Sequence, residues 1–278
     1  MNVQTPTGNT TTPIRLIATD MDGTFLGADG LPSQTNCDAV YRAAAVGVPT
    51  VFATGRPSRW IQPLDKVRDA HPLVITSNGA VISDLEHDTI VHAYPLDPVV
   101  TTQVVKDLRA AVPRITFAVE YLHTWGSEKD YPLFGYQETD LIAPVEDLLT
   151  RDTVVKLLIR APIPTPELMD LVAPVVRGRL TATFSFVTDF GFLEVSPLGI
   201  SKASALEQVL ADLGIPASDV AAFGDMPNDL AMLDLVGHPF VMGNGHEMLK
   251  ERGFPVCGDH DDSAFGTTVM EILGLDPE

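Results

Sequence analysis

The chain has 278 residues, of which 45% are hydrophobic and 20% are charged. This composition is typical of a globular protein and excludes wholesale disorder. Lys and Arg number 18 against 37 Asp and Glu, so the formal net charge is −19. Because such a surface repels polyphosphates and anionic lipids, we expect neither a nucleic acid nor a membrane as a partner.

The first 13 residues form a polar stretch without a basic or an apolar region, so we expect a disordered tail and not a signal peptide. Cys37 and Cys257 are too few for a disulfide framework, and no apolar stretch approaches 18 residues. These features predict a cytoplasmic protein with two free thiols.

Short apolar runs that end in turn residues recur along the chain, and such runs are typical of strands buried on both faces. They predict strands at residues 14–19, 48–53, 73–76, 220–223 and 240–242, with a weaker one at 255–257. Amphipathic stretches between them predict helices at residues 35–45, 58–70, 202–213, 229–235 and 263–273. The alternation of strand and helix predicts an α/β fold with a Rossmann-like parallel sheet.

The alternation stops in the middle of the chain. Residues 81–94 resemble a hairpin with its turn near 86–88, and the stretch 123–152 has no clear period. Beyond the hairpin, the pattern predicts helices at 98–111 and 165–176, the second disturbed near its end by Pro174, and strands at 115–122, 154–159, 181–188 and 192–195. We therefore expect an inserted α+β domain with an antiparallel sheet. The predicted division is a tail at 1–13, a core at 14–95 and 191–278, and an insert at 96–190.

Polar residues follow the predicted strands of the core at the point where each strand ends. In an open parallel sheet, ligands bind outside the carboxyl ends of the strands, so these residues should share one crevice. The crevice would contain residues 20–24, 54–56, 77–79, 224–225 and 228–229, with Lys202 following the inserted domain.

Such a set of residues is suited to phosphoryl transfer. Carboxylates in one crevice repel each other unless a cation neutralises them, and a histidine-free oxygen site suits Mg²⁺. A carboxylate can attack phosphorus, and a second carboxylate two residues later can donate a proton and then activate water. The Thr54-Gly55 turn could hold phosphate oxygens, and the Lys202 ammonium could offset developing charge.

Four segments resemble, in order and spacing, the motifs of the haloacid dehalogenase superfamily of phosphatases. They are DMDGT at 20–24, TGR at 54–56, Lys202, and GDMPND at 224–229. The insert, together with SNGA at 77–80, EVSPLGISK at 194–202 and MGN at 242–244, resembles the Cof-type branch with a type-B cap. The resemblance covers nearly the whole chain from Ile14, and Phe25 departs from the aliphatic residue more common there.

The resemblance implies a role for each residue. Asp20 would be the nucleophile and a Mg²⁺ ligand, and Asp22 would be the general acid and base with its backbone carbonyl on the metal. Thr54 and Lys202 would join them in catalysis. The implied substrate-binding residues are Thr54, Gly55, Asn78, Lys202 and Asn228, and the implied metal residues are Asp20, Asp22, Asp225 and Asp229.

The sequence thus predicts a Mg²⁺-dependent phosphomonoester hydrolase for small phosphorylated metabolites, sugar phosphates first among them. Two alternatives remain open: a phosphomutase acting on hexose phosphates, and a non-catalytic sensor of a phosphorylated metabolite. In the expected cap, Trp125, Tyr131 and Tyr136 could stack on a sugar, although packing is the favoured interpretation. The oligomeric state and the particular substrate are left open.

Overall fold

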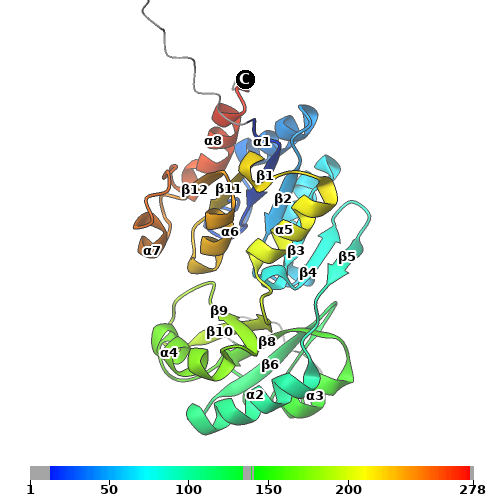
Figure 1. The fold of residues 1–278 in the computed structure, drawn as a ribbon, viewed down its shortest axis with the longest axis vertical. Helices are drawn as coiled ribbons and strands as arrows, with labels where there is room; N and C mark the ends of the chain where they lie inside the picture. Colours follow the sequence, from blue (N-terminus) through cyan, green and yellow to red (C-terminus); the bar gives the residue numbers. More distant parts are fainter. Residues whose placement is uncertain (1–12, 134–138, 140, 276–278) are drawn as a thin grey trace, which may run out of the picture.

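The computed structural model describes residues 13–133, 139 and 141–275. Two sheets lie one above the other, each with its own helices (Figure 1). The tail expected at 1–13 lies outside the described residues except for Pro13. Among the described residues, no helix is both long and apolar enough to cross a membrane.

The larger sheet has seven strands in the order β12-β11-β1-β2-β3-β4-β5. Its first five strands are parallel, and β4 and β5 continue it as the predicted antiparallel hairpin. The strands are β1 Leu16–Thr19, β2 Thr50–Ala53, β3 Leu73–Thr76, β4 Val81–Asp84, β5 Thr89–Ala93, β11 Val220–Gly224 and β12 His238–Val241. The stretch predicted at 255–257 contributes a single bridge between Val241 and Val256. The predicted parallel core is therefore confirmed.

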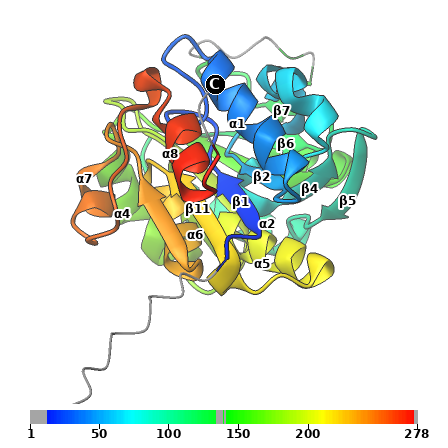
Figure 2. The ribbon, with the colours of Figure 1, turned by 90° about the horizontal axis from the view of Figure 1, so that it is seen from above.

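Helices cover both faces of this sheet (Figure 2). One face packs on α1 (Gln34–Ala45) and α8 (Ala264–Ile272), and the other packs on α5 (Lys202–Leu213) and α6 (Leu230–Leu235), while α7 (Glu247–Lys250) lies near the β12 edge. Phe25 is fully buried and meets the rings of Phe52 and Phe265 edge to face. Its departure from the family pattern is thus a matter of packing, because the larger ring fills the space between the sheet and α8.

The prediction of an α-helix at 58–70 is wrong. The chain forms two 3₁₀ segments there, Ser58–Trp60 and Gln62–Ala70. Pro63 has no N–H for the Arg59 carbonyl, which accepts a hydrogen bond from the Gln62 side chain instead. Amphipathic spacing alone did not reveal this break in the α-helical ladder.

The smaller sheet is antiparallel throughout, in the order β7-β6-β8-β10-β9. Its strands are β6 Thr116–Tyr121, β7 Trp125–Ser127, β8 Val154–Arg160, β9 Leu180–Thr183 and β10 Phe192–Pro197, and its helices are α2 Pro98–Ala111, α3 Val145–Arg151 and α4 Thr165–Val176. The strand predicted at 181–188 therefore stops at Thr183. The unassigned stretch 123–152 supplies β7 and α3, and residues 134–138 and 140 lie outside the described part.

The second sheet and its helices form the cap. The predicted division at residue 190 placed β10 with the core, whereas β10 pairs with β8 and β9 and belongs to the cap sheet. The strand pattern groups the run at 192–195 with the antiparallel sheet, as the structure does, so only the position of the predicted boundary differs. Helices α2 and α3 lie on the side of the cap sheet away from the core, so its other face is directed toward the core (Figure 1).

Candidate active site

The turn after β1 brings two distant motifs together. Asp20 is buried, and Gly23 adopts a φ of +73°, where a Cβ atom would lie 2.4 Å from Oδ2 of Asp225. The hydroxyl of Thr24 donates a hydrogen bond to Oδ1 of Asp225 at 3.2 Å. The Gly-Thr pair of the motif therefore allows Asp225 to approach Asp20 and holds it there.

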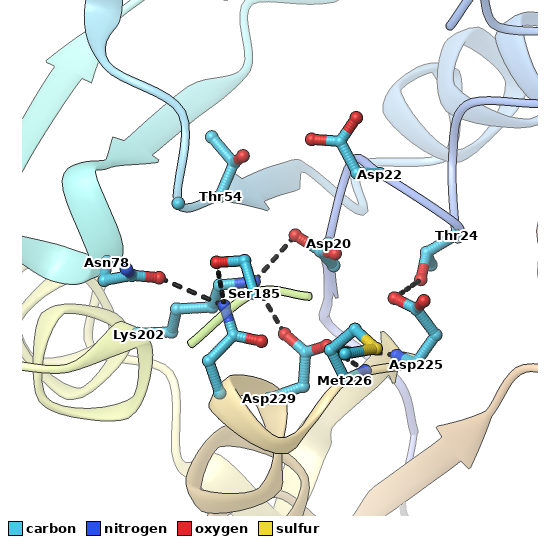
Figure 3. Close-up of polar contacts among 12 residues, drawn as sticks. Asp20, Asp22, Thr24, Thr54, Asn78, Ser185, Lys202, Asp225, Met226 and Asp229 are labelled. Carbon is cyan, nitrogen blue, oxygen red and sulfur yellow. Dashed lines mark hydrogen bonds and ion pairs between the residues drawn. The ribbon is translucent and has the colours of Figure 1, made fainter. Parts of the chain in front are cut away.

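Three buried carboxylates, which we call the carboxylate group, meet at the carboxyl ends of β1 and β11 (Figure 3). One oxygen from each of Asp20, Asp225 and Asp229 lies within 4.8 Å of the others. Burial raises the pKa of Asp20 well above its ordinary value and, with the nearby charge of Asp229, raises the pKa of Asp225 to about 7. Without a metal ion, Asp20 and Asp225 therefore tend to retain protons.

Lys202 supplies the single ammonium ion in contact with this group among the described residues. Its Nζ donates to Oδ1 of Asp20 and to Oδ1 of Asp229, both at 2.7 Å (Figure 3). Burial by itself lowers the pKa of Lys202, but the two carboxylates hold it above its ordinary value. With every group ionised, the cluster keeps an excess of two negative charges, which suits a divalent cation with oxygen ligands.

Asp229 has a distinct position within the group. Its Oδ2 accepts hydrogen bonds from the backbone N–H groups of Asp225 and Met226, both at 3.0 Å, while its Oδ1 accepts from Lys202. A Cβ atom on Gly224 would lie 2.6 Å from the Cβ of Asp229, so glycine is needed for this close packing. Asp229 thus fixes the loop that presents Asp225.

The carboxylate of Asp22 is turned away from the carboxylate group, and its side chain is 55% exposed. Arg56 binds it through two hydrogen bonds, from Nε at 2.8 Å and from Nη2 at 2.5 Å. The third contact of Arg56 runs from Nη1 to the backbone carbonyl of Trp60. Arg56 is absent from the predicted site residues, although the TGR motif contains it.

The remaining predicted residues lie beside this group, at the ends of β2, β3 and β11. The hydroxyl of Thr54 accepts the N–H of Arg56, and the Asn228 amide donates to Oδ1 of Asn78 at 3.1 Å. Nδ2 of Asn78 and Oδ1 of Asn228 are buried and have no partner among the described residues. Buried polar atoms of this kind are costly unless a ligand satisfies them, so they suit a bound oxyanion and its hydroxyl or water partners.

The cap contributes residues that the sequence analysis missed. Lys156 of β8 donates to the Gly55 carbonyl and to Oε1 of Glu194, both at 2.6 Å. Ser185 donates to Oε2 of Glu194 and accepts from the Asn228 amide at 3.3 Å. A Cβ atom on Gly55 would lie 2.8 Å from the Ser185 hydroxyl, so glycine permits this close approach of cap to core.

A second ion pair joins cap and core nearby. Arg59 of the core donates two hydrogen bonds to the buried Glu120 of β6. Burial raises the pKa of Glu120 even though Arg59 opposes that shift. We call Arg59, Glu120, Lys156 and Glu194 the interface cluster. In β8, VVKLLIR, the signal in the sequence is a pair of charged residues four positions apart, on one face of an otherwise apolar strand.

Between cap and core lies a cavity of about 1140 Å³. Asp20, Asp22 and Thr54 line it from the core, and Glu194 and Phe192 line it from the cap. By contrast, Trp125 and Tyr131 are buried in the apolar layer of the cap, as packing predicted, and Tyr136 lies outside the described residues. Asp20 of the carboxylate group thus lines a space large enough for a small organic substrate.

The α/β core, the cap and the acidic crevice between them define a capped hydrolase. A family model of haloacid dehalogenase-like hydrolases matches residues 17–267, and the chain belongs to that family. The predicted resemblance is therefore confirmed.

Individual relatives agree with this assignment. The 5-amino-6-(5-phospho-D-ribitylamino)uracil phosphatase YcsE of Bacillus subtilis is 30% identical over 242 residues, which cover 86% of this chain and 87% of that protein. The solved structure of the phosphatase BT1666 from Bacteroides thetaiotaomicron aligns with a TM-score of 0.82 and 23% identity, covering 96% of this chain and 97% of that one. That of the subclass IIB sugar phosphatase BT4131 aligns with a TM-score of 0.77 and 19% identity, covering 94% and 99%. The last two show likeness of fold.

Proposed function

We propose that this phosphatase of the haloacid dehalogenase family is a Mg²⁺-dependent phosphomonoester hydrolase that works through an aspartyl-phosphate on Asp20. The observation that carries the proposal is the carboxylate group, which has an excess of two negative charges when every member is ionised and whose Asp20 lines the cavity. Buried charge of this kind destabilises the fold, so its presence favours a functional role.

The residues present fit a magnesium ion. Asp20 and Asp225 would hold it together with the backbone carbonyl of Asp22. Asp229 instead accepts hydrogen bonds from Lys202 and from the backbone N–H groups of Asp225 and Met226, and so positions them. This arrangement differs from the sequence expectation, which placed Asp229 among the metal residues. When bound, Mg²⁺ would neutralise the carboxylates and polarise a phosphoryl oxygen.

In the proposed reaction, a carboxylate oxygen of Asp20 attacks phosphorus and the bond to the leaving alcohol breaks. Asp22 gives its proton to the alcohol oxygen, and then takes a proton from the water that hydrolyses the aspartyl-phosphate to free phosphate. Thr54, Asn78 and Lys202 hold the phosphoryl oxygens during both steps.

The proposed substrates are small phosphorylated metabolites, sugar phosphates among them. The cavity of about 1140 Å³ between cap and core supports this, because its volume suits a small organic phosphate. The relative YcsE is named for a phosphorylated ribityl compound, which is also a small phosphomonoester. The cap, which lines part of this space, would set specificity.

The test is hydrolysis of p-nitrophenyl phosphate with Mg²⁺ or with EDTA, by the wild type and by Asp20→Asn. We expect EDTA to abolish turnover and Asp20→Asn to lower it at least about 10³-fold, because the nucleophile is lost. Asp130→Asn, which changes an exposed carboxylate of the cap, should leave turnover unchanged. Equal activity of Asp20→Asn and wild type would overturn the mechanism, and an isomeric sugar phosphate in place of free phosphate would indicate a phosphomutase.

A further inference from the structure

Aromatic side chains line the same cavity as Asp20. Trp60 stands on the core side, and Phe186, Phe190 and Phe192 come from the cap, the first two from the loop at 184–191 that joins β9 to β10. Phe186 remains 39% exposed, whereas Phe192 is 1% exposed. A partly exposed aromatic ring that lines a cavity is apolar surface that a ligand can cover.

Phe192 packs against one face of the Phe186 ring. The two rings stack with centroids 5.0 Å apart and planes within 8° of parallel. The Arg160 guanidinium lies 4.6 Å from the centroid of the Phe192 ring, and Phe192 also packs in the apolar layer with Trp125 and Tyr131. The support makes Phe186 a firm flat surface at the cavity wall, and not a loose side chain.

Several polar side chains along the same walls are already engaged within the protein. Both oxygens of Glu194 accept hydrogen bonds, from Lys156 and from Ser185. Thr188 donates to the Phe190 carbonyl, and Gln62 donates to the Arg59 carbonyl. A polyhydroxylated leaving group needs partners for each of its hydroxyls, and these walls offer more ring surface than uncommitted polar atoms.

We propose that the preferred substrate is a phosphomonoester whose alcohol carries an aromatic or heteroaromatic ring, bound between Trp60 and Phe186 while the phosphate lies at Asp20. This inference rests on the proposed function and narrows its substrate class from sugar phosphates in general. The ring is recognised by its flat apolar faces, so fused heterocycles on a short chain fit the site as well as simple phenyl groups.

The test compares three primary phosphomonoesters with Mg²⁺: 2-phenylethyl phosphate, 2-cyclohexylethyl phosphate and glucose 6-phosphate. The first two share the same two-carbon chain to the phosphate and differ in the flatness of the ring. We expect kcat/KM to be highest for the phenyl compound. Phe186→Leu and Trp60→Leu should each lower that value by about three- to tenfold and leave glucose 6-phosphate nearly unchanged, since aromatic pairing is lost.

Phe184→Leu is the matched control, because Phe184 lies two residues away and packs on the cap core outside the cavity lining. Phe184→Leu should not change the ratio of kcat/KM for 2-phenylethyl phosphate to kcat/KM for glucose 6-phosphate. Two results would overturn the aromatic assignment without contradicting the proposed hydrolase function. One is a higher kcat/KM for glucose 6-phosphate than for 2-phenylethyl phosphate, and the other is an equal loss of kcat/KM on these two substrates in Phe186→Leu. Absence of hydrolysis of all three esters and of p-nitrophenyl phosphate would overturn the proposed function itself.

Discussion

Two buried charge clusters lie at the junction of core and cap, and they differ in balance. The carboxylate group sets three carboxylates against the ammonium of Lys202. The interface cluster sets two carboxylates against two cations, each carboxylate in direct contact with one of them. Each cluster joins segments far apart in the chain, so sequence separation does not distinguish one cluster from the other.

The difference in charge balance distinguishes a cluster with a functional role from one with a structural role. A neutral cluster whose polar atoms are paired can dock two domains at little net cost, whereas unbalanced buried charge destabilises a fold unless a ligand compensates it. The interface cluster therefore serves to hold the cap, and the carboxylate group marks the place for a cation and a phosphate. Paired variants of the two clusters test this contrast.

The largest effect is expected from replacing the two buried lysines. Lys202→Met should lower kcat by about 10²–10³-fold, because the phosphoryl group and Asp20 lose their stabilising ammonium. Lys156→Met should instead destabilise the protein by about 3–5 kcal/mol, since Glu194 keeps a buried charge without its partner. Steady-state kinetics and urea unfolding of both variants measure the two effects. Equal loss of kcat in both would remove the distinction between the clusters.

The next effect is stabilisation by magnesium. At a concentration 100 times its Kd, Mg²⁺ should raise the free energy of unfolding of the wild type by about 2.7 kcal/mol. Asp225→Asn should lose most of this gain, while Glu194→Gln, the same carboxylate-to-amide change in the balanced cluster, should keep it. Thermal unfolding with and without Mg²⁺ gives the comparison, and a gain of equal size in both variants would contradict it.

A smaller effect is expected from pH in the metal-free protein. The pKa of Asp225 is raised to about 7, so between pH 4 and 7 the folded state keeps a proton that the unfolded state has lost. Stability in EDTA should therefore fall as the pH rises through this range and level off above it. Melting temperatures from pH 5 to 8 measure the slope, which should be shallower in Asp225→Asn. A melting temperature that rises with pH over this range in the wild type, and rises less in Asp225→Asn, would contradict the raised pKa of Asp225.

The smallest effect concerns Arg56, which holds Asp22 by a fork of two hydrogen bonds. Arg56→Lys should lower kcat about three- to tenfold, because a single ammonium cannot reproduce the fork that positions the acid and base. Stability should hardly change, since the pair is partly exposed. Arg252→Lys, which alters the exposed pair with Asp234, is the control. Unchanged kcat in Arg56→Lys would exclude a positioning role.

Much of the core could be predicted because its signals are local. Each parallel strand is a short apolar run that ends in a polar turn, and Asp20, Thr54, Asn78 and Asp225 follow such runs directly. The 3₁₀ segments at 58–70 were missed because amphipathic spacing does not show which carbonyl loses its partner at Pro63. The predicted boundary at residue 190 lies before β10, although the strand pattern groups that strand with the antiparallel sheet.

By itself, the sequence determined the alternation of strand and helix and the residues at the strand ends, because both depend on neighbours along the chain. The tertiary structure alone decided that Arg56 binds Asp22, that Lys156 reaches the Gly55 carbonyl, and that aromatic rings of cap and core share one cavity. These contacts depend on how the cap docks on the core, and docking is set by the fit of two surfaces that no local pattern in the chain records.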